Sequence, residues 1–318
     1  MPSIIGLPQY INYHYHPNFI SLFVFFTILY SIPPLIITFW MTKYWVKNWK
    51  TMTKTGLRSD IFGLFLAVQI INEIEVLVVN ISYRMPMTGI FTSFIASANP
   101  QLLIDTLQLT LYAFVHLKNL ITLAFCVVRV AILYSSRMER KMYFKELSVI
   151  LLAFIVVSVF LSWIRNKESS TCVQLEPPYP FGALRIVLLH PIDDNALYGK
   201  IEEFMYPTII FILLVSTAMT FWKLHQFRVQ SRNLSLSRKK TDMKSEKTLT
   251  GTMVLILLPI LMTEIIVICE SMGNHTFVLG QIRAFFGDAR AHVVSCYFYW
   301  THPIFKKKTS LKKIDTST

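Results

Sequence analysis

The stretch LLIDTLQLTLYAFVHLKNLITLAFCVV, residues 102–128, decides the fold class of this chain. It is longer than the roughly 20 residues that a helix needs to cross the hydrocarbon core of a bilayer. Charge enters only at Asp105 and Lys118. Read at about 100° per residue, five of its polar side chains fall on one face, which lipid would not tolerate: Asp105, Gln108, Tyr112, His116 and Asn119. The stretch therefore predicts a membrane-spanning helix that turns a polar face toward other helices.

Six further apolar runs of similar length accompany it. They are residues 19–41, 61–79, 147–163, 204–222, 249–269 and 278–300. The chain of 318 residues is 53% hydrophobic and 15% charged, with a mean hydropathy of +0.49, which is far from the balance of a soluble protein. We predict an all-α membrane protein, a seven-transmembrane helix bundle. The last run is the least apolar, because it contains Arg283, Asp288 and Arg290.

The distribution of Lys and Arg predicts the orientation of the bundle. Alternate connections hold five (43–60), five (129–147), eight (223–248) and five (301–318), whereas those on the opposite side hold five in all. Basic connections stay in the cytosol. We therefore expect an extracellular N-terminus, residues 1–18, and a cytosolic basic C-terminal tail, residues 301–318.

Three acceptor patterns for N-glycosylation bear on that orientation. Asn274 lies in an outward connection and is the expected glycosylation site, while Asn233 lies in a cytosolic one. Asn80 is also outward, but close to the bilayer. A glycan on Asn233 would contradict the orientation.

Signatures of other protein classes are missing from the sequence. It contains no HExxH, P-loop, GxGxxG or GxSxG motif, so we expect no enzyme, no catalytic residues and no cofactor. His14 and His16 have no third ligand nearby in sequence, so we predict no metal site. The net charge of +13 is distributed between apolar runs rather than over a solvated face, which argues against nucleic acid as a partner.

Two polar stripes predict a ligand site inside the bundle. On the third predicted span, residues 102–128, the stripe runs from the outer end to mid-membrane. On the seventh, residues 278–300, a similar stripe includes Gln281 and Ser295. The predicted ligand-binding residues are Asp105, Gln108, Tyr112, His116, Asp288 and His292. The alternative is that these groups, and especially His116 and Asn119, form hydrogen bonds between helices.

Two further intramembrane features carry charge. Glu73 and Lys118 both lie about 17 Å from the cytosolic ends of consecutive spans, which predicts an ion pair. Arg129 ends span three at the cytosolic boundary, where a fork of donors can change partners, so we predict a role in G-protein coupling and switching. The alternative is an arginine that only sets topology.

Two outward segments resemble a known family. They are RMPMTGIFTSFIASANP (84–100) and CVQLEPPYPFGALRI (172–186), and the segment YWTHPIFKKK (299–308) supports them. The two outward segments are similar to the nematode serpentine receptors of class U (Sru), with Arg129 and the pair Leu249-Thr250 in agreement, and the third segment is similar to nematode chemoreceptors more widely. The family commonly has a Cys near Ile95 as the extracellular partner of Cys172, and this sequence lacks it.

The resemblance implies a seven-transmembrane chemoreceptor that couples to a G protein. Its expected partners are a small-molecule or peptide cue, a heterotrimeric G protein and the lipid bilayer. Its expected place is the plasma membrane of sensory neurons, with cilia as one candidate. The alternative from another class is a small transporter or an ion-channel subunit, although the halves of the chain show no internal repeat of the kind that transporters have.

Overall fold

A computed structural model describes residues 3–50, 52, 59–98, 100–134, 144–165, 170–188, 197–231, 237–272 and 276–305. The chain packs as two units. Unit 1 comprises Met1–Ile32, Glu73–Leu120 and Leu151–Tyr206, and unit 2 comprises Pro33–Asn72, Ile121–Ile150 and Pro207–Thr318. Two of the boundaries between them fall at prolines inside helices, Pro33 and Pro207.

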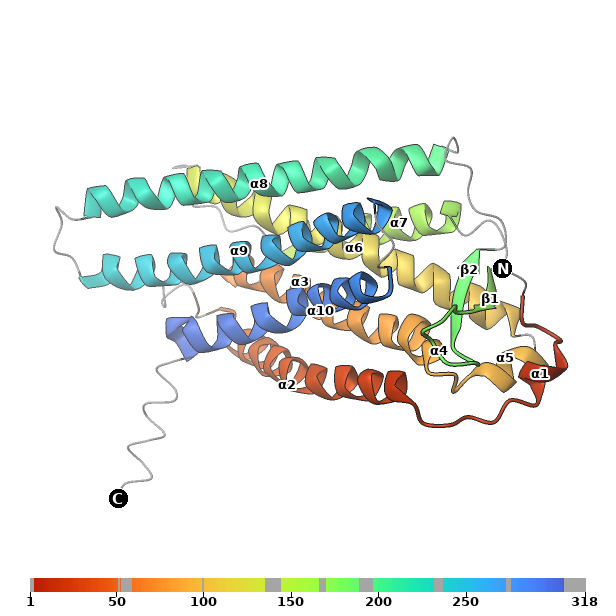
Figure 1. Ribbon diagram of the computed structural model, residues 1–318. Coiled ribbons are helices and arrows are strands. Elements are labelled where there is room, and N and C mark those ends of the chain that lie inside the picture. Colours follow the sequence, from red (N-terminus) through yellow and green to blue (C-terminus); the bar gives the residue numbers. More distant parts are fainter. Residues whose placement is uncertain are drawn as a thin grey trace, which may run out of the picture. The chain divides into compact units, whose positions relative to one another are not determined.

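Seven long helices make up most of the described residues (Figure 1). They are α2 (Phe19–Asn48), α3 (Ser59–Val79), α6 (Gln101–Tyr134), α7 (Phe144–Arg165), α8 (Leu197–Ser231), α9 (Ser237–Met272) and α10 (Thr276–Thr301). Each of the seven predicted spans lies within one of them. The helices α2, α3, α6, α7 and α8 continue from one unit into the other, whereas α9 and α10 belong to unit 2.

Apolar length explains five of these helices directly. By length and composition, the described parts of α2, α3, α6, α7 and α8 can each cross a membrane. In α9 the described apolar stretch is shorter, Lys247–Thr263. Helix α10 carries buried Asp288, Arg290 and His292, which lower its hydropathy. The fold is therefore an all-α membrane protein that fits a seven-span bundle.

The connection between spans five and six, residues 223–248, is helical over most of its length. Helix α8 continues to Ser231 and α9 begins at Ser237, so only residues 232–236 of this connection lie outside the described residues. Lys, Arg, Gln and Glu have high helix propensity, which lets both helices run past their apolar parts. The apolar runs thus underestimate the lengths of α8 and α9.

Unit 1 also contains the short elements that close one end of the helices. They are α1 (Pro8–Ile11), a π-helix (Asn80–Arg84), α4 (Met85–Met87), α5 (Thr92–Ala98), β1 (Ser170–Gln174) and β2 (Leu184–Leu188). The strands pair antiparallel with Cys172 opposite Ile186. We call this β1–β2 pair the hairpin, and its end of unit 1 the hairpin side.

Aromatic rings form the core of unit 2. Phe65 stacks on Phe298 at 4.4 Å between ring centroids, and Phe62 stacks on Phe298 at 5.4 Å. Just beyond α10, the chain turns back so that Phe305 contacts Phe298 and Tyr44. This turn joins α2, α3 and α10 through one aromatic cluster.

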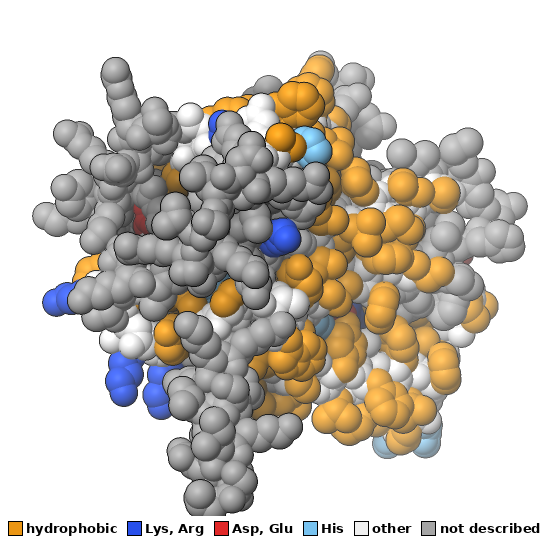
Figure 2. Space-filling model, turned by 90° about the vertical axis from the view of Figure 1, so that its left-hand side faces the viewer, with side chains coloured by type: hydrophobic (Ala, Val, Ile, Leu, Met, Phe, Trp, Pro, Cys, Tyr) orange, Lys and Arg blue, Asp and Glu red, His pale blue; other side chains and the backbone are white. Residues whose placement is uncertain are grey.

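Hydrophobic side chains also cover much of the described surface. Figure 2 shows them as broad patches on the face that it presents, with few described charged side chains among them. Helix α7 is the extreme case, because its buried face includes Ser158 and Ser162 while most of its Val, Ile and Phe side chains are exposed. An apolar exterior of this kind is what contact with lipid requires.

The first prediction concerns His302, which is buried in the aromatic cluster of unit 2. Its ring stacks on Phe298 at 4.7 Å, and burial lowers its pKa from 6.5 to about 4. The neutral form is therefore favoured in the folded protein. The contribution of neutral His302 to the free energy of unfolding is fully present above pH 6.5, the pKa of the unfolded state. It is lost as the pH falls from 6.5 toward 4, by about 3 kcal/mol in total.

Thermal unfolding of the detergent-solubilised protein at about pH 7 and about pH 5 measures this loss. We expect His302→Phe to reduce the pH dependence and His225→Gln, a change at an exposed histidine of unit 2, to leave it unchanged. Equal pH dependence in His302→Phe and the unaltered protein would contradict the prediction.

Candidate functional site

The polar residues at the start of α6 hold the hairpin. Asp105 Oδ1 accepts a hydrogen bond from the backbone N–H of Ser170 at 2.8 Å. Gln101 Nε2 donates to the Asp105 carboxylate at 3.0 Å and to the carbonyl oxygen of Ser170 at 2.7 Å. Asp105 and Gln101 thus satisfy both backbone groups at the first residue of β1.

Gln108 does the same for the second strand. Its Nε2 donates to the carbonyl oxygen of Ile186 at 3.0 Å, and the side chain is buried. Asp105 and Gln108 lie about one turn apart on α6, so one helix face binds both strands. Two of the predicted ligand residues therefore position the hairpin, and direct contact with a ligand stays a prediction for them.

The N-terminal segment adds a third layer of contacts to the hairpin. Ser3 forms a bridge with Val173, and the N–H of Ile4 donates to the carbonyl oxygen of Cys172 at 3.1 Å. The N–H of Gly6 donates to Ala96 of α5 at 3.0 Å. Residues 3–13, which we call the strap, thus tie the hairpin to α5.

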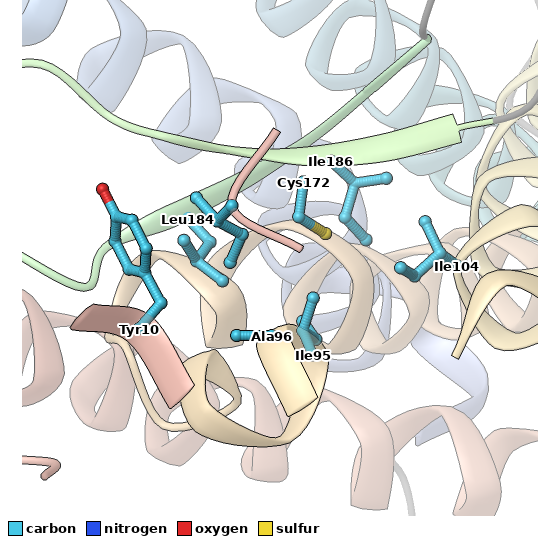
Figure 3. Close-up of a cluster of buried hydrophobic side chains, with 8 residues drawn as sticks. Tyr10, Ile95, Ala96, Ile104, Cys172, Leu184 and Ile186 are labelled. Carbon is cyan, nitrogen blue, oxygen red and sulfur yellow. The ribbon is translucent and has the colours of Figure 1, made fainter. Parts of the chain in front are cut away.

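An apolar cluster lies beneath these contacts (Figure 3). Its members come from the strap, α5, α6 and both strands, and they are Ile4, Tyr10, Ile95, Ala96, Ile104, Cys172, Leu184 and Ile186. Burial of these apolar side chains stabilises the packing of the strap and α5 against the hairpin. We call the strap, α5 and the hairpin together the lid.

The PPYPFG loop, residues 177–182, packs on the strap. The Phe181 ring stacks on Tyr10 at 4.9 Å and meets Tyr13 edge-on at 5.9 Å. Gly182 has a φ of 88°, and a side chain there would clash with the Tyr13 ring, so glycine is required on both counts. The hydroxyl of Thr92 donates a hydrogen bond to the carbonyl oxygen of Gly182. The backbone N–H of Gly182 donates to Gln174 Oε1 at 2.8 Å. The loop is a fixed part of the lid.

Cys172 is a free thiol in the lid cluster. Ile95, the position at which the resemblance implied a partner cysteine, belongs to the same cluster. Cys172 and Ile95 therefore pack in one apolar cluster, in the region where the family resemblance implied a disulfide. Burial raises the pKa of the Cys172 thiol to about 12, which keeps it protonated at neutral pH.

Beyond the hairpin contacts, the α6 stripe meets two other helices. The guanidinium carbon of Arg165, at the end of α7, lies 3.6 Å from the centroid of the Tyr112 ring. The buried His116 faces Tyr206 of α8 with ring centroids 6.4 Å apart. Tyr112 and His116 therefore lie where α6, α7 and α8 face one another in unit 1.

Lys118 forms a hydrogen-bonded ion pair with Glu75, two residues along α3 from the predicted partner Glu73. Its Nζ lies 2.6 Å from Glu75 Oε1. Glu73 and Glu75 leave α3 about 200° apart, so the rotation of the helix decides between them, and depth in the membrane does not. We therefore assign Glu75 to the pair, and Glu73 is a buried neighbour.

The predicted residues of span seven lie in unit 2. Asp288 and His292 are buried on α10. The same helix carries Ser295, which donates to Gln69 Oε1 of α3 at 2.9 Å and lies 2.9 Å from the hydroxyl of Thr38 on α2. Contact of Asp288 and His292 with a ligand stays a prediction.

Buried arginines in unit 2 bond to threonine hydroxyls. Arg290 of α10 donates to Thr122 of α6. Arg129, which is 1% exposed, donates from Nη2 to Thr250 Oγ1 of α9 at 2.8 Å. Next to Thr250, Gly251 lets the Tyr297 ring of α10 approach the α9 backbone, because any side chain at Gly251 would clash with that ring. Sequence reasoning missed these partners, because a threonine in an apolar run gives no signal that it will bond an arginine.

Other predicted sites have different outcomes. Asn274 and Asn233 lie outside the described residues. Asn80 is buried in the π-helix and its Oδ1 accepts a hydrogen bond from Arg84 at 2.8 Å, which leaves no room for a glycan. Among the described residues, no group of three or more His, Cys, Asp or Glu side chains could hold a metal ion.

The long, apolar helices fit the class of seven-transmembrane proteins. The crystal structure of squid rhodopsin has a similar fold, with a TM-score of 0.62 and 14% sequence identity over 98% of this chain and 85% of that chain. The family model of the serpentine type 7TM GPCR chemoreceptor Sru matches residues 4–308. The chain belongs to this Sru family, which is a family of receptors. No match is found among curated proteins.

The second prediction tests whether the lid shelters Cys172. In a Cys269→Ser/Cys296→Ser variant, we expect maleimide to label Cys172 only after denaturation, because the thiol is buried and protonated. Tyr10→Ala removes a ring from the lid cluster and should speed labelling of the native protein by roughly tenfold or more.

Mass spectrometry of the peptide that contains Cys172 measures the labelling. Tyr15→Ala is the matched control, because Tyr15 is an exposed residue just beyond the strap. Rapid labelling of Cys172 in the native Tyr15→Ala protein would show that the lid does not protect it.

Proposed function

We propose that this protein is a G-protein-coupled chemosensory receptor that binds an extracellular chemical within its helices and activates a cytosolic heterotrimeric G protein. One observation carries the proposal: the continuous helix α6 holds the lid at one end and a buried, hydrogen-bonded arginine at the other. Such a helix can connect events under the lid to events at Arg129. We propose the same orientation as the basic residues predict, with the N-terminus and lid outside.

The ligand is proposed to bind against the polar stripe of α6. Tyr112 and His116 are its candidate contacts in unit 1, because they lie deeper than the hairpin contacts and face α7 and α8. Asp105 and Gln108 act there through the hairpin, whose position they determine. Asp288 and His292, which belong to unit 2, keep their separate prediction as ligand contacts. A small molecule or a peptide could supply the hydrogen-bonding groups that these side chains recognise.

A screen of a chemical panel against the expressed receptor, with a second messenger as the readout, tests this function.

The third prediction uses an agonist found in that way. Gln108→Leu removes the hydrogen bond to Ile186 and Tyr112→Phe removes a hydroxyl, and each should lower agonist potency by roughly tenfold, the worth of about one hydrogen bond. Thr106→Val is the control, because Thr106 lies on the exposed face of the same helix.

Unchanged dose-response curves for both variants at normal surface expression would remove α6 from the ligand site.

The competing function, an ion-channel subunit or transporter, has its own test. Chemically evoked current from the purified protein in liposomes, without any G protein, would favour an ion-channel subunit or transporter over a receptor.

The coupling step is proposed to depend on release of Arg129. The side chain is buried and bonded to Thr250, so a cytosolic partner can contact it only after α6 and α9 have separated there. Loss of a hydrogen bond to a charged group costs about 1.5–3 kcal/mol. That cost sets the range over which this contact can bias the equilibrium between a resting and a coupling state.

The fourth prediction follows from this contact. Thr250→Val has nearly the shape of threonine but no hydroxyl, so it should raise basal nucleotide exchange on the G protein by roughly tenfold. Thr250→Ser keeps the hydroxyl and should behave as the unaltered receptor. Arg129→Ala should lose coupling at normal surface expression. Normal signalling by Arg129→Ala would instead indicate an arginine that serves topology alone.

A further inference from the structure

The connection between α3 and α6 has an unusual composition for a segment outside the apolar spans. From Met85 to Ile104 it contains no Asp, Glu, Lys or Arg. The hairpin segment on the same side of unit 1 contains Glu176 and Arg185. Uncharged, apolar connections are rare at a water-exposed surface, since exposed loops are normally polar.

The structure shows which apolar side chains of this connection reach the surface. Helix α5 turns Thr92, Ile95 and Ala96 into the protein. On other faces of the connection, Ile90 is 52% exposed and Phe94 is 48% exposed. The segment is therefore amphipathic, with an apolar surface opposite the lid cluster.

This apolar surface leads directly into a membrane-spanning helix. Leu102 is 82% exposed and Leu103 is 48% exposed in the first turn of α6, which begins at Gln101 soon after α5 ends at Ala98. The exposed side chains of α6 beyond that point belong to a helix that is apolar enough to cross a membrane. Ile90, Phe94, Leu102 and Leu103, which we call the apolar corner, are thus continuous in sequence with a lipid-facing surface.

We propose that the apolar corner docks into the lipid leaflet on the hairpin side, at the boundary between headgroups and acyl chains. The chemistry favours lipid as the occupant, because short amphipathic segments with exposed Phe, Leu and Ile bury their apolar faces about 5–10 Å into that boundary. The membrane is then a second support of the lid, beside the contacts that α6 makes with the hairpin. Under the proposed orientation this is the outer leaflet, but the docking itself requires no ligand and no G protein.

Phe181 provides a matched control within the same lid. It is 53% exposed, close to the value for Phe94, but it lies at the tip of the hairpin loop and packs on Tyr10 and Tyr13. Glu176 directly precedes the PPYPFG loop, and β2 carries the exposed Arg185. The two phenylalanines are thus equal in type and exposure, and the proposal places Phe94 in lipid and Phe181 in water.

Site-directed spin labelling in nanodiscs that each hold one receptor copy tests the proposal. Nitroxides are attached to Phe94→Cys and Phe181→Cys in the Cys269→Ser/Cys296→Ser background, where the remaining Cys126 and Cys172 are buried. Collision rates with oxygen, which partitions into lipid, are compared with those of a water-soluble nickel complex. We expect the oxygen-to-nickel ratio at Phe94→Cys to exceed that at Phe181→Cys by roughly threefold or more.

Equal ratios at the two positions, both typical of water, would overturn the proposal. So would protection of the Phe94→Cys label from both reagents, which would show that protein covers this surface. Leu103→Cys and Ile90→Cys give independent readings if Phe94→Cys does not fold, and both should follow the lipid pattern. Failure of chemical activation or of G-protein coupling has no bearing on this result, so the two proposals can fail separately.

Discussion

Polar and charged side chains inside a bilayer must find partners in the protein, because lipid offers none and water is remote. In this chain α6 meets that requirement for much of the molecule. Within unit 1 its side chains bond to both strands of the hairpin, lie against Arg165 of α7 and pair with Glu75 of α3. Within unit 2 its side chains bond to α9 and α10. The positions of its neighbours along α6 follow from these contacts.

The lid shows how the same requirement applies to backbone groups. There the backbone of the hairpin supplies the groups that need partners, and Asp105, Gln108 and the strap provide them. The cluster around Cys172 then buries the apolar faces of strand, strap and α5 together. Many weak contacts distributed over several segments replace the single covalent link that the family resemblance implied.

Much of this architecture could be predicted from the sequence, because apolar length and helical periodicity are local properties. The seven runs lie inside the seven long helices, and the α6 stripe does face other elements. The partners were harder to predict, because they depend on the rotation of each helix and on backbone atoms. Helix rotation brings Glu75 to Lys118, and Asp105 accepts a hydrogen bond from the Ser170 backbone. Helices α8 and α9 proved longer than their apolar runs, since hydropathy does not register a polar helix.

Helix α10 has a consequence for how the protein is made. Arg290 and Asp288 each oppose insertion of an isolated helix by about 2.5–3.5 kcal/mol at its centre. The hydroxyls and amide that α10 meets, those of Thr122, Thr38 and Gln69, belong to helices that are synthesised before it. Insertion of α10 by the translocon is therefore a cooperative event that depends on earlier helices being in place. We therefore expect changes at Thr122 or Gln69, residues far from α10 in sequence, to reduce insertion of α10 as well as to weaken its packing.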